Sequence, residues 1–460
     1  MICKTTRTTT TPPGTGGGTA RTAFPGLAAL AVLAALVQGC AAGTPSPAQG
    51  AATPSSPGSA GAAERGTDAT SILLIGDTGY DYDWLEAEDY EQPLTARDFV
   101  IAELDDWLED KMPVDEFRLP SMHYLEKTGG YVMASGMWPV SQAAIEWCAA
   151  PSRCTFGVMV GDNIYPSGAT LGTDGRDDEE RFADLLWEPY KGFLEQDPDF
   201  RLYAVLGNHD WETSREGAML QVEYMEASPL YHMDGIYYRA RPAPDVELFA
   251  IDTTVMLAGH TVYKDLLDDA GVPQRSDELE PEVPWAMPEG DEAGMLGWLE
   301  RSLRESDARW KIVIAHHPLW SSSGTKVEEE IVLRRILRPM LCRYADAYIA
   351  GHDHMLEVHT DDCRDQAQGD APPLLHIVSG AAGKQRPEHS SFMAWQEREH
   401  PGFRSLYVRS LVWGFGELVL EGDGAHVLML TTPRDGSGGT AVEFDARFER
   451  RSGVLRGQAD

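Results

Sequence analysis

Short apolar runs rich in β-branched residues recur along the chain, and each run ends in polar residues. The runs cover 72–75, 156–160, 202–206, 312–315 and 347–350. Continuous apolar runs of this length are typical of strands that are buried on both faces of a sheet. In α/β proteins, ligand-binding residues gather at the carboxyl ends of such strands. The pattern therefore predicts an α/β protein whose polar groups meet at one edge of a sheet.

Between these runs, apolar residues recur at the spacing of amphipathic helices. The residues that share a helix face are Val100, Leu104, Trp107 and Leu108 in one segment and Leu296, Leu299 and Leu303 in another. Helices that alternate with buried strands support the α/β interpretation.

Two stretches interrupt this alternation and are interpreted as insertions on the surface. The first, 80–150, is acidic in its first half, and the second, 261–294, is rich in Asp, Glu and Pro. One large domain is expected to span 70–432 and to carry both insertions near its functional site. The remaining tail, 433–460, is rich in Gly and Arg and is expected to be partly mobile.

The N-terminus has the features of an export signal. A polar stretch with Lys4, Arg7 and Arg21 precedes an apolar run over 27–37. That run suits a signal peptide and is too short to span a membrane. A buried core helix is disfavoured, because sequence rich in Pro, Ser, Gly and Ala follows at once.

The residues Val37-Gln38-Gly39-Cys40 resemble a bacterial lipobox. The resemblance implies cleavage of a signal peptide, 1–39, before Cys40 and attachment of a lipid to the cysteine sulfur. Residues 40–69 are then expected to form a flexible linker. We expect an exported lipoprotein that is anchored in the bacterial cell envelope, in the periplasm or at the cell surface.

After export, the remaining cysteines are Cys148, Cys154, Cys342 and Cys363. An even number of cysteines in an oxidising compartment suggests disulfides. Proximity in the sequence favours the pairs Cys148–Cys154 and Cys342–Cys363, although other connectivities are possible. A zinc site is the alternative, but these spacings lack paired C-x-x-C clusters.

The chain of 460 residues is strongly acidic, with a formal net charge of −35. Apolar residues make up 42% of it, which is normal for a globular enzyme. Its acidic surface repels nucleic acids and anionic membranes, which proteins bind through Lys and Arg. We therefore expect a monomer that acts on small substrates, binds no nucleic acid and contacts a membrane only through the lipid at Cys40.

Polar residues with metal-ligating chemistry follow the five predicted strands. These groups are Asp77-Thr78-Gly79, Gly161-Asp162, Gly207-Asn208-His209-Asp210, His316-His317-Pro318 and Gly351-His352-Asp353-His354. Each group is a weak signal alone, because such residues are also common in turns. Their order, each after a predicted strand, resembles the metallophosphoesterase superfamily over 70–432. The resemblance implies an α/β sandwich of two mixed β-sheets flanked by helices, with a metal site at the carboxyl ends of the strands.

Tyr165 narrows the resemblance. The sequence Gly161-Asp162-Asn163-Ile164-Tyr165 is similar to the purple acid phosphatase form of the second motif, in which the tyrosine is an iron ligand. The segments 249–253, 315–320 and 348–354 resemble the small, tartrate-resistant type of that family. The alternative for Tyr165 is a structural role, in which its ring packs under a loop.

The resemblance implies a dinuclear metal centre. The donors assigned to Fe(III) are Asp77, Tyr165 and His354, and those assigned to a divalent ion (Fe, Zn or Mn) are Asn208, His316 and His352. Asp162 would bridge both ions. Carboxylate and phenolate oxygens suit a highly charged ion, whereas imidazole and amide groups suit a softer divalent one. Two such ions can turn a bound water into hydroxide and clamp a phosphate, which implies acid phosphatase activity on phosphate monoesters.

His209 is the candidate catalytic residue. Beside the ligand Asn208, it could stabilise the transition state or protonate the leaving oxygen, and its alternative is a structural histidine behind the ligands. Asp210 is expected to orient an imidazole or to cap the following helix. The His-x-Pro pattern assigns the ligand to His316 and leaves His317 behind it.

Two other functions remain open. A metallophosphodiesterase with Mn or Zn in both sites would keep every ligand except a functional Tyr165. A non-catalytic lipoprotein could use the same domain to bind a ligand or a partner. Because no ligand position is missing, the sequence favours an enzyme that hydrolyses small phosphorylated substrates.

Overall fold

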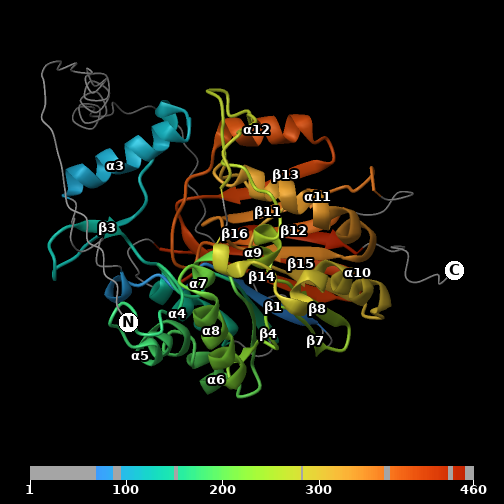
Figure 1. The fold of residues 1–460 in the computed structure, drawn as a ribbon. Coiled ribbons are helices and arrows are strands. Elements are labelled where there is room, and N and C mark those ends of the chain that lie inside the picture. Colours follow the sequence, from blue (N-terminus) through green and yellow to red (C-terminus); the bar gives the residue numbers. More distant parts are fainter. Residues whose placement is uncertain are drawn as a thin grey trace, which may run out of the picture. The chain divides into compact units, whose positions relative to one another are not determined.

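Two seven-stranded mixed sheets pack against each other at the centre of the molecule (Figure 1). The order of the first sheet is β16 (Ala441–Glu449), β15 (Gly424–Thr432), β14 (Trp413–Glu421), β1 (Thr70–Ile75), β4 (Phe156–Val160), β5 (Leu202–Val205) and β6 (Tyr231–His232). The order of the second is β13 (Phe403–Arg409), β11 (Leu356–Asp361), β12 (Leu374–Ser379), β10 (Ala347–Ala350), β9 (Trp310–Ile314), β8 (Val246–Ala250) and β7 (Tyr238–Ala243).

The structure is a computed structural model that describes residues 69–85, 95–149, 154–280, 283–366, 373–433 and 439–450. All of them belong to one compact unit. The predicted signal peptide, the lipobox cysteine and the linker up to residue 68 lie outside the described residues.

The predicted apolar runs form parallel strands. In the first sheet β1, β4, β5 and β6 run parallel, and in the second β8, β9, β10 and β12 do. Nearly all residues of the strands that the runs predicted are buried, as continuous apolar runs require. The predicted strands and the sandwich of two mixed sheets are therefore confirmed.

Helices flank both sheets. They are α3 (Ala96–Glu109), α4 (Met137–Cys148), α5 (Asp178–Phe182), α6 (Gly192–Gln196), α7 (Asn208–Trp211), α8 (Arg215–Ala227), α9 (Thr253–Ala258), α10 (Met295–Glu305), α11 (Val327–Tyr344) and α12 (Ser390–Glu399). Helix α4 contacts the first sheet and α10 the second. Within the described ranges, no helix is both long enough and apolar enough to cross a membrane.

Helix α3 buries most of the face on which its apolar residues share a position. Phe99, Leu104 and Trp107 are buried, whereas Leu108 is 38% exposed. The buried face is centred near Trp107, and the next residue lies about 100° further round the helix. Leu108 therefore falls at the edge of the buried face.

The first predicted insertion, 80–150, is only partly a surface element. Its last part, helix α4, buries Met137, Val140, Ala143 and Ala144 in the main core. The prediction that the whole stretch is a surface elaboration is wrong, because one face of this helix is apolar and packs on β14.

The rest of this insertion is held against the segment that follows β12. It contains α3 and a hairpin of β2 (Met122–Tyr124) and β3 (Tyr131–Met133). The Ser121 amide donates to Oε1 of Gln385 (2.7 Å), and Arg118 pairs with Glu388 (2.5 Å). These contacts join the surface part of the insertion to a segment close to the predicted metal site.

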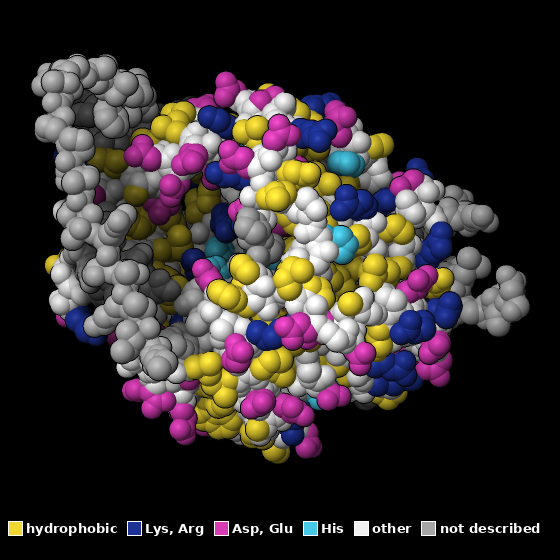
Figure 2. Space-filling model, in the orientation of Figure 1, with side chains coloured by type: hydrophobic (Ala, Val, Ile, Leu, Met, Phe, Trp, Pro, Cys, Tyr) yellow, Lys and Arg dark blue, Asp and Glu magenta, His cyan; other side chains and the backbone are white. Residues whose placement is uncertain are grey.

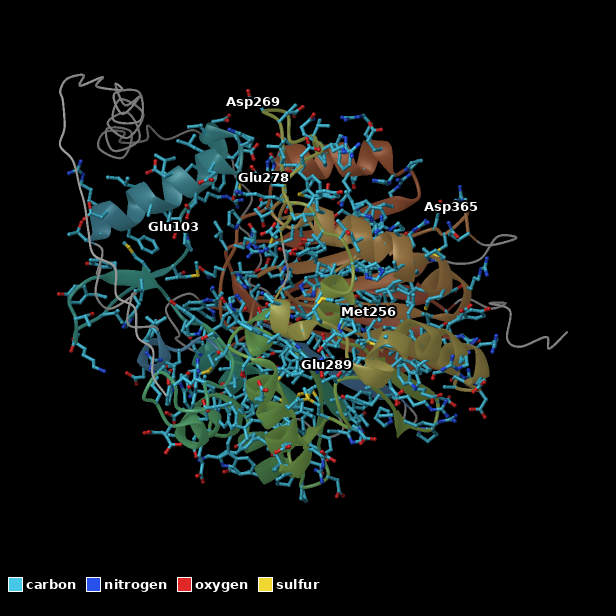
Figure 3. All side chains as sticks on the ribbon, viewed as in Figure 1. Glu103, Met256, Asp269, Glu278, Glu289 and Asp365 are labelled. Atoms are coloured by element: carbon cyan, nitrogen blue, oxygen red, sulfur yellow. A yellow bond between two sulfur atoms is a disulfide. The ribbon has the colours of Figure 1, made fainter. Side chains whose placement is uncertain are left out.

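The second predicted insertion, 261–294, is a surface loop that is joined to helix α11. Figure 3 shows Asp269 at its outer end. Nearer the core, the Asp265 carboxylate accepts hydrogen bonds from the amides of Val327 (3.1 Å) and Glu328 (2.8 Å). Because these amides have no partner within the helix, the loop caps and stabilises the first turn of α11.

The predicted tail, 433–460, contains another strand. Strand β16 pairs antiparallel with β15, so the sheet extends beyond the domain boundary predicted at residue 432. The missed signal is the alternation of Val442, Phe444 and Phe448 with charged residues, which is the period of a strand. That boundary is therefore wrong.

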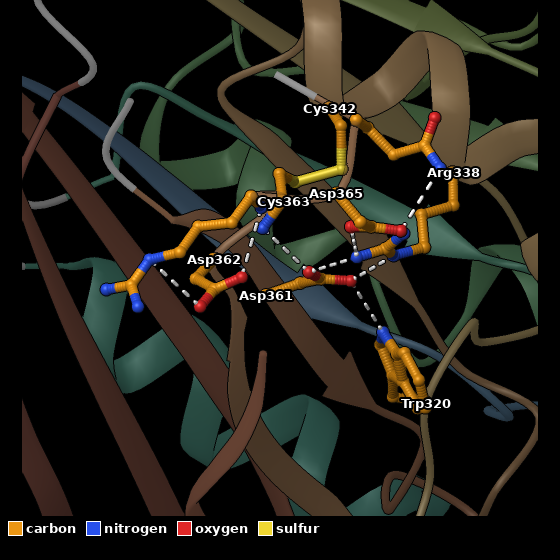
Figure 4. Close-up of a disulfide and its surroundings, with 9 residues drawn as sticks. Trp320, Arg338, Cys342, Asp361, Asp362, Cys363 and Asp365 are labelled. Atoms are coloured by element: carbon orange, nitrogen blue, oxygen red, sulfur yellow. Dashed lines mark hydrogen bonds and ion pairs between the residues drawn. A yellow bond between two sulfur atoms is a disulfide. The ribbon is translucent and has the colours of Figure 1, made fainter. Parts of the chain in front are cut away.

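Two disulfides join the predicted cysteine pairs, Cys148–Cys154 and Cys342–Cys363. The second disulfide ties α11 to the end of β11 (Figure 4). Beside it, the Arg338 guanidinium pairs with the carboxylates of Asp361 (2.5 Å) and Asp365 (2.7 Å). All four sulfurs are used in disulfides, so the alternative zinc site has no thiolate ligand among them.

Candidate metal centre

The seven predicted ligands meet at the carboxyl ends of the parallel strands of both sheets. Asp77 follows β1, Asp162 and Tyr165 follow β4, Asn208 follows β5, His316 follows β9, and His352 and His354 follow β10. All of them are buried except Asn208, which is partly exposed. The structure thus brings together every residue that the sequence motifs singled out, while metal ligation by them stays a prediction.

The first group of donors surrounds the hydroxyl of Tyr165. This oxygen lies 2.7 Å from Oδ2 of Asp162, 3.2 Å from Oδ1 of Asp77 and 3.1 Å from Nε2 of His354. The hydroxyl can donate one hydrogen bond, whereas carboxylate oxygens and unprotonated imidazole nitrogens are all acceptors. A cation shared by these groups would stabilise the acceptors that a single proton cannot satisfy.

The second group surrounds the side-chain oxygen of Asn208. It lies 3.1 Å from Nε2 of His316 and 3.0 Å from Nδ1 of His352, and these two nitrogens are 3.1 Å apart. The other nitrogen of the His316 ring faces the carbonyl oxygen of Val160 (2.8 Å), which orients the imidazole. The donor set fits a divalent ion.

Asp162 belongs to both groups. Its Oδ2 faces the Tyr165 hydroxyl, and its Oδ1 lies 3.3 Å from Nε2 of His316. Oδ1 also accepts a hydrogen bond from the amide of His209 (3.0 Å). One carboxylate therefore presents an oxygen to each donor group, which is the arrangement that a bridging ligand requires.

The buried carboxylates and the imidazoles of the site interact strongly with one another. Burial raises the pKa of Asp77 well above its usual range, although His316 opposes the rise. Burial acts in the same direction on Asp162, but His316 and His209 outweigh it and hold the pKa of this carboxyl well below its usual range. Burial alone would lower the pKa of His316, yet the Asp162 carboxylate raises it to about 10. Cations between these groups would let both carboxylates ionise together.

The backbone at the ligands is strained. Asp77, Asp162 and His352 have φ angles of 57°, 51° and 68°, which residues other than glycine rarely adopt. Neighbouring glycines make room for the carboxylates. A Cβ atom on Gly207 would lie 2.2 Å from Oδ1 of Asp162, and one on Gly351 would lie 2.4 Å from Oδ2 of Asp77. The glycines of these motifs are therefore required by close packing around the donors.

His209 lies at the solvent-facing edge of the site. Its side chain is 29% exposed, and its ring centroid is 4.5 Å from that of Tyr165. Nδ1 faces the carbonyl oxygen of Pro166 and lies 3.1 Å from Oε2 of Glu212. Because these contacts engage Nδ1, Nε2 is the ring atom that could reach a substrate.

Asp210 holds two ligand-bearing turns together. Its carboxylate accepts hydrogen bonds from the amides of Gly207 (2.8 Å), Asn163 (3.0 Å) and Ile164 (3.0 Å). It therefore stabilises the start of the short helix α7, to which it belongs, and fixes the turn after β4, whereas the following helix α8 is capped by Ser214.

His317 lies beside the second donor group. Its Nδ1 is 2.8 Å from Oγ1 of Thr253, and its Nε2 is 3.8 Å from Oε2 of Glu329. Ring nitrogens of His316, His317 and His352 lie within 4.8 Å of one another. The bond to Thr253 turns Nδ1 away from the ligands, in keeping with a position behind them.

Three charged residues near the centre were not predicted. Oε2 of Glu329, on the first turn of α11, lies 3.3 Å from Nε2 of His352. Lys384 lies with its Nζ 4.8 Å from the centroid of the Tyr165 ring, and Arg386 follows in the same segment. In the sequence, Lys384 and Arg386 could have been noticed only by their position after a buried strand.

A model of the calcineurin-like phosphoesterase family matches residues 70–356. The chain belongs to this family. The match contains all seven predicted ligands and His209. Lys384 and Arg386 lie beyond it, so the family model does not account for them.

The relatives of this calcineurin-like phosphoesterase include purple acid phosphatases. Purple acid phosphatase 4 of Arabidopsis thaliana is 29% identical over 259 residues, which cover 54% of this chain and 65% of that protein. Tartrate-resistant acid phosphatase type 5 of Sus scrofa is 27% identical over 212 residues, which cover 45% and 55%. The chain thus spans less than two thirds of the length of these relatives.

A solved structure of purple acid phosphatase PPD1 from yellow lupin (Lupinus luteus) seeds is also similar. The comparison has a TM-score of 0.49 and 14% sequence identity, and it covers 84% of this chain and 54% of that one.

Proposed function

We propose that this phosphoesterase hydrolyses phosphate monoesters at a dinuclear centre of Fe(III) and a divalent ion. The observation that carries the proposal is the Tyr165 hydroxyl, 2.7 Å from Asp162 and 3.1 Å from His354. A phenolate is a hard, anionic ligand that favours a highly charged ion. The amide and imidazole donors on the other side suit Fe(II), Zn(II) or Mn(II).

The seven predicted ligands, all buried except Asn208, would divide between the two ions as the motifs suggest. The first ion would be held by Asp77, Tyr165 and His354, the second by Asn208, His316 and His352, with Asp162 shared. When bound, the two ions would clamp a phosphate and activate a water for in-line displacement. The chain needs no nucleophilic side chain of its own for this reaction.

His209 would handle the proton of the leaving group. With Nδ1 engaged by Pro166 and Glu212, its Nε2 would donate a proton to the leaving oxygen or stabilise the charge that develops there. The acid phosphatases among the relatives support the proposal that this chain has that activity.

We further propose small phosphorylated molecules as substrates of a monomeric, envelope-bound enzyme. The net charge of −35 opposes binding to nucleic acids. The two disulfides fit an oxidising compartment. A lipid on Cys40 would provide the membrane anchor.

A phosphatase assay tests the proposal. The purified, metal-loaded protein is incubated with p-nitrophenyl phosphate and with bis(p-nitrophenyl) phosphate from acidic to neutral pH. We expect the monoester to react faster, with more activity at acidic pH, and Asp162→Asn to abolish the reaction. Asp269→Asn, at the outer end of a loop, is the control. Faster hydrolysis of the diester would instead indicate a phosphodiesterase, and no hydrolysis of either ester would indicate a binding protein.

A further inference from the structure

Two positive charges lie at the edge of the predicted metal centre in a protein with a net charge of −35. Nζ of Lys384 lies 4.8 Å from the centroid of the Tyr165 ring and 5.5 Å from that of Tyr80. Ammonium groups at this distance are attracted by the electron-rich ring faces. Lys384 is therefore oriented by the same ring whose hydroxyl belongs to the first donor group.

Arg386 contacts the last sequence motif, Gly351 to His354, at this edge of the site. Its Nη1 lies 2.6 Å from Oδ1 of Asp353, and its amide donates to the carbonyl oxygen of His354 (3.2 Å). The guanidinium of Arg386 is thereby fixed against the turn that carries the predicted ligand His354.

These cations belong to the part of the site that faces solvent. The ligand His354 is 5% exposed, whereas the side chains of Arg386 and His209 are 24% and 29% exposed and Lys384 is half-buried. Figure 2 shows histidine side chains next to Lys or Arg side chains in a hollow of the surface. A phosphate that reaches the donors therefore has these groups beside it.

The segment that carries Lys384 is held in place by the first insertion. The next residue, Gln385, accepts a hydrogen bond from the Ser121 amide, and Glu388 pairs with Arg118. These bonds hold side chains on both sides of Arg386. A preorganised cation binds an anion more strongly than one that must be ordered on binding.

We propose that Lys384 is a specificity-determining residue that binds a second phosphoryl group of the substrate, next to the one that is cleaved. The inference rests on the proposed phosphatase function. The acidic protein repels a diphosphate more strongly than a monoester, so a local cation is needed to favour it. An ammonium has three N–H donors and can contact the ring faces while it donates to a phosphoryl oxygen.

Hydrolysis of such a substrate yields two phosphates. In pyrophosphate, water adds to one phosphorus, the bridging P–O bond breaks, and the second phosphate leaves. The oxygen of the water stays on the first phosphate, and its protons are shared between the two products. Lys384 would bind the departing phosphate and take no part in the bond changes.

Kinetics with two substrates test the proposal on the metal-loaded full chain. Phenyl phosphate offers one phosphoryl group and pyrophosphate offers two. We expect Lys384→Met to lower kcat/KM for pyrophosphate by about ten- to a hundredfold, mainly through KM, because a hydrogen bond to a charged group is lost. Phenyl phosphate should change much less, and Lys384→Arg should restore much of the loss. Lys191→Met, which removes a surface charge, is the matched control.

Equilibrium binding supplies a readout that does not depend on turnover. Methylenediphosphonate cannot be hydrolysed, and calorimetry should show weaker binding to Lys384→Met than to the wild type, while methylphosphonate binds both equally. Equal losses for phenyl phosphate and pyrophosphate, or unchanged binding of methylenediphosphonate, would overturn the role of Lys384 alone. If the metal-loaded wild type hydrolyses neither substrate, the proposed function fails and this inference fails with it.

Discussion

The hydroxyl of Tyr165 lies 2.7 Å from Oδ2 of Asp162, deep in the protein and away from solvent. The other oxygen of the same carboxylate faces His316 at 3.3 Å. Two sets of donors therefore share one residue, and the donor types differ between the sets. This difference is the physical basis for assigning a highly charged ion to one side and a divalent ion to the other.

The role of His209 predicts a dependence on the leaving group. If Nε2 protonates the leaving oxygen, His209→Asn should lower kcat/KM for an alkyl phosphate by about a hundred- to ten-thousandfold. The loss should be smaller for p-nitrophenyl phosphate, whose leaving group needs no proton. Metal content should stay the same, and Glu212→Gln should have a minor effect. Equal losses for both esters would contradict a general-acid role.

Replacing Glu329 is expected to weaken the binding of the second metal ion alone. Its Oε2 lies 3.3 Å from Nε2 of His352, and carboxylates in such positions orient metal-binding imidazoles. Glu329→Gln should weaken the affinity for the divalent ion by about ten- to a hundredfold and leave the first ion in place. Competition with a chelator, followed by metal analysis, measures this. Glu328→Gln on the same turn is the control, and equal losses of metal in the two variants would refute the assignment.

Asp265 predicts a pH dependence of stability. Burial raises its pKa from 3.8 to about 7 in the folded protein. Between these values the folded state binds a proton that the unfolded state does not, so this group's contribution to the unfolding free energy falls as pH rises. The difference in unfolding free energy between wild type and Asp265→Asn should therefore fall by up to about 1.4 kcal/mol per pH unit over this range.

Chemical denaturation at several pH values measures the effect of Asp265. Asp269→Asn, on the same loop but at its exposed end, serves as the control and should keep the pH dependence of the wild type. A difference between wild type and Asp265→Asn that stays constant, or that grows as pH rises, would show that the buried carboxyl does not take up the proton.

The sequence predicted the parallel strands and the ligand set because both leave strong local signals. A strand buried on two faces is apolar throughout, and polar residues at its end stand out. Glu329 left no such signal, because it reaches His352 only when Asp265 has fixed the start of α11. Strand β16 was missed because it is largely exposed. Its alternation of apolar and charged residues is also hard to see next to a polar, Gly-rich stretch.

The helix faces show a second limit of the sequence. The spacing places Leu104, Trp107 and Leu108 on one face of α3, but the buried part of that face is centred near Trp107 and leaves Leu108 at its edge. Spacing identifies neighbours on a helix, whereas the tertiary contact decides which neighbours are buried. Lys384 illustrates the same limit, because its closeness to Tyr165 arises from the turn after β12 and from the first insertion.

Metal analysis of the purified protein, together with its visible spectrum, tests the central claim most directly. We predict iron and a divalent ion in equal amounts, and a visible charge-transfer band that comes from Tyr165. Tyr165→Phe should lose this band together with its iron and keep the fold. Mn or Zn in both positions, with a metal content and a rate that Tyr165→Phe leaves unchanged, would contradict the account.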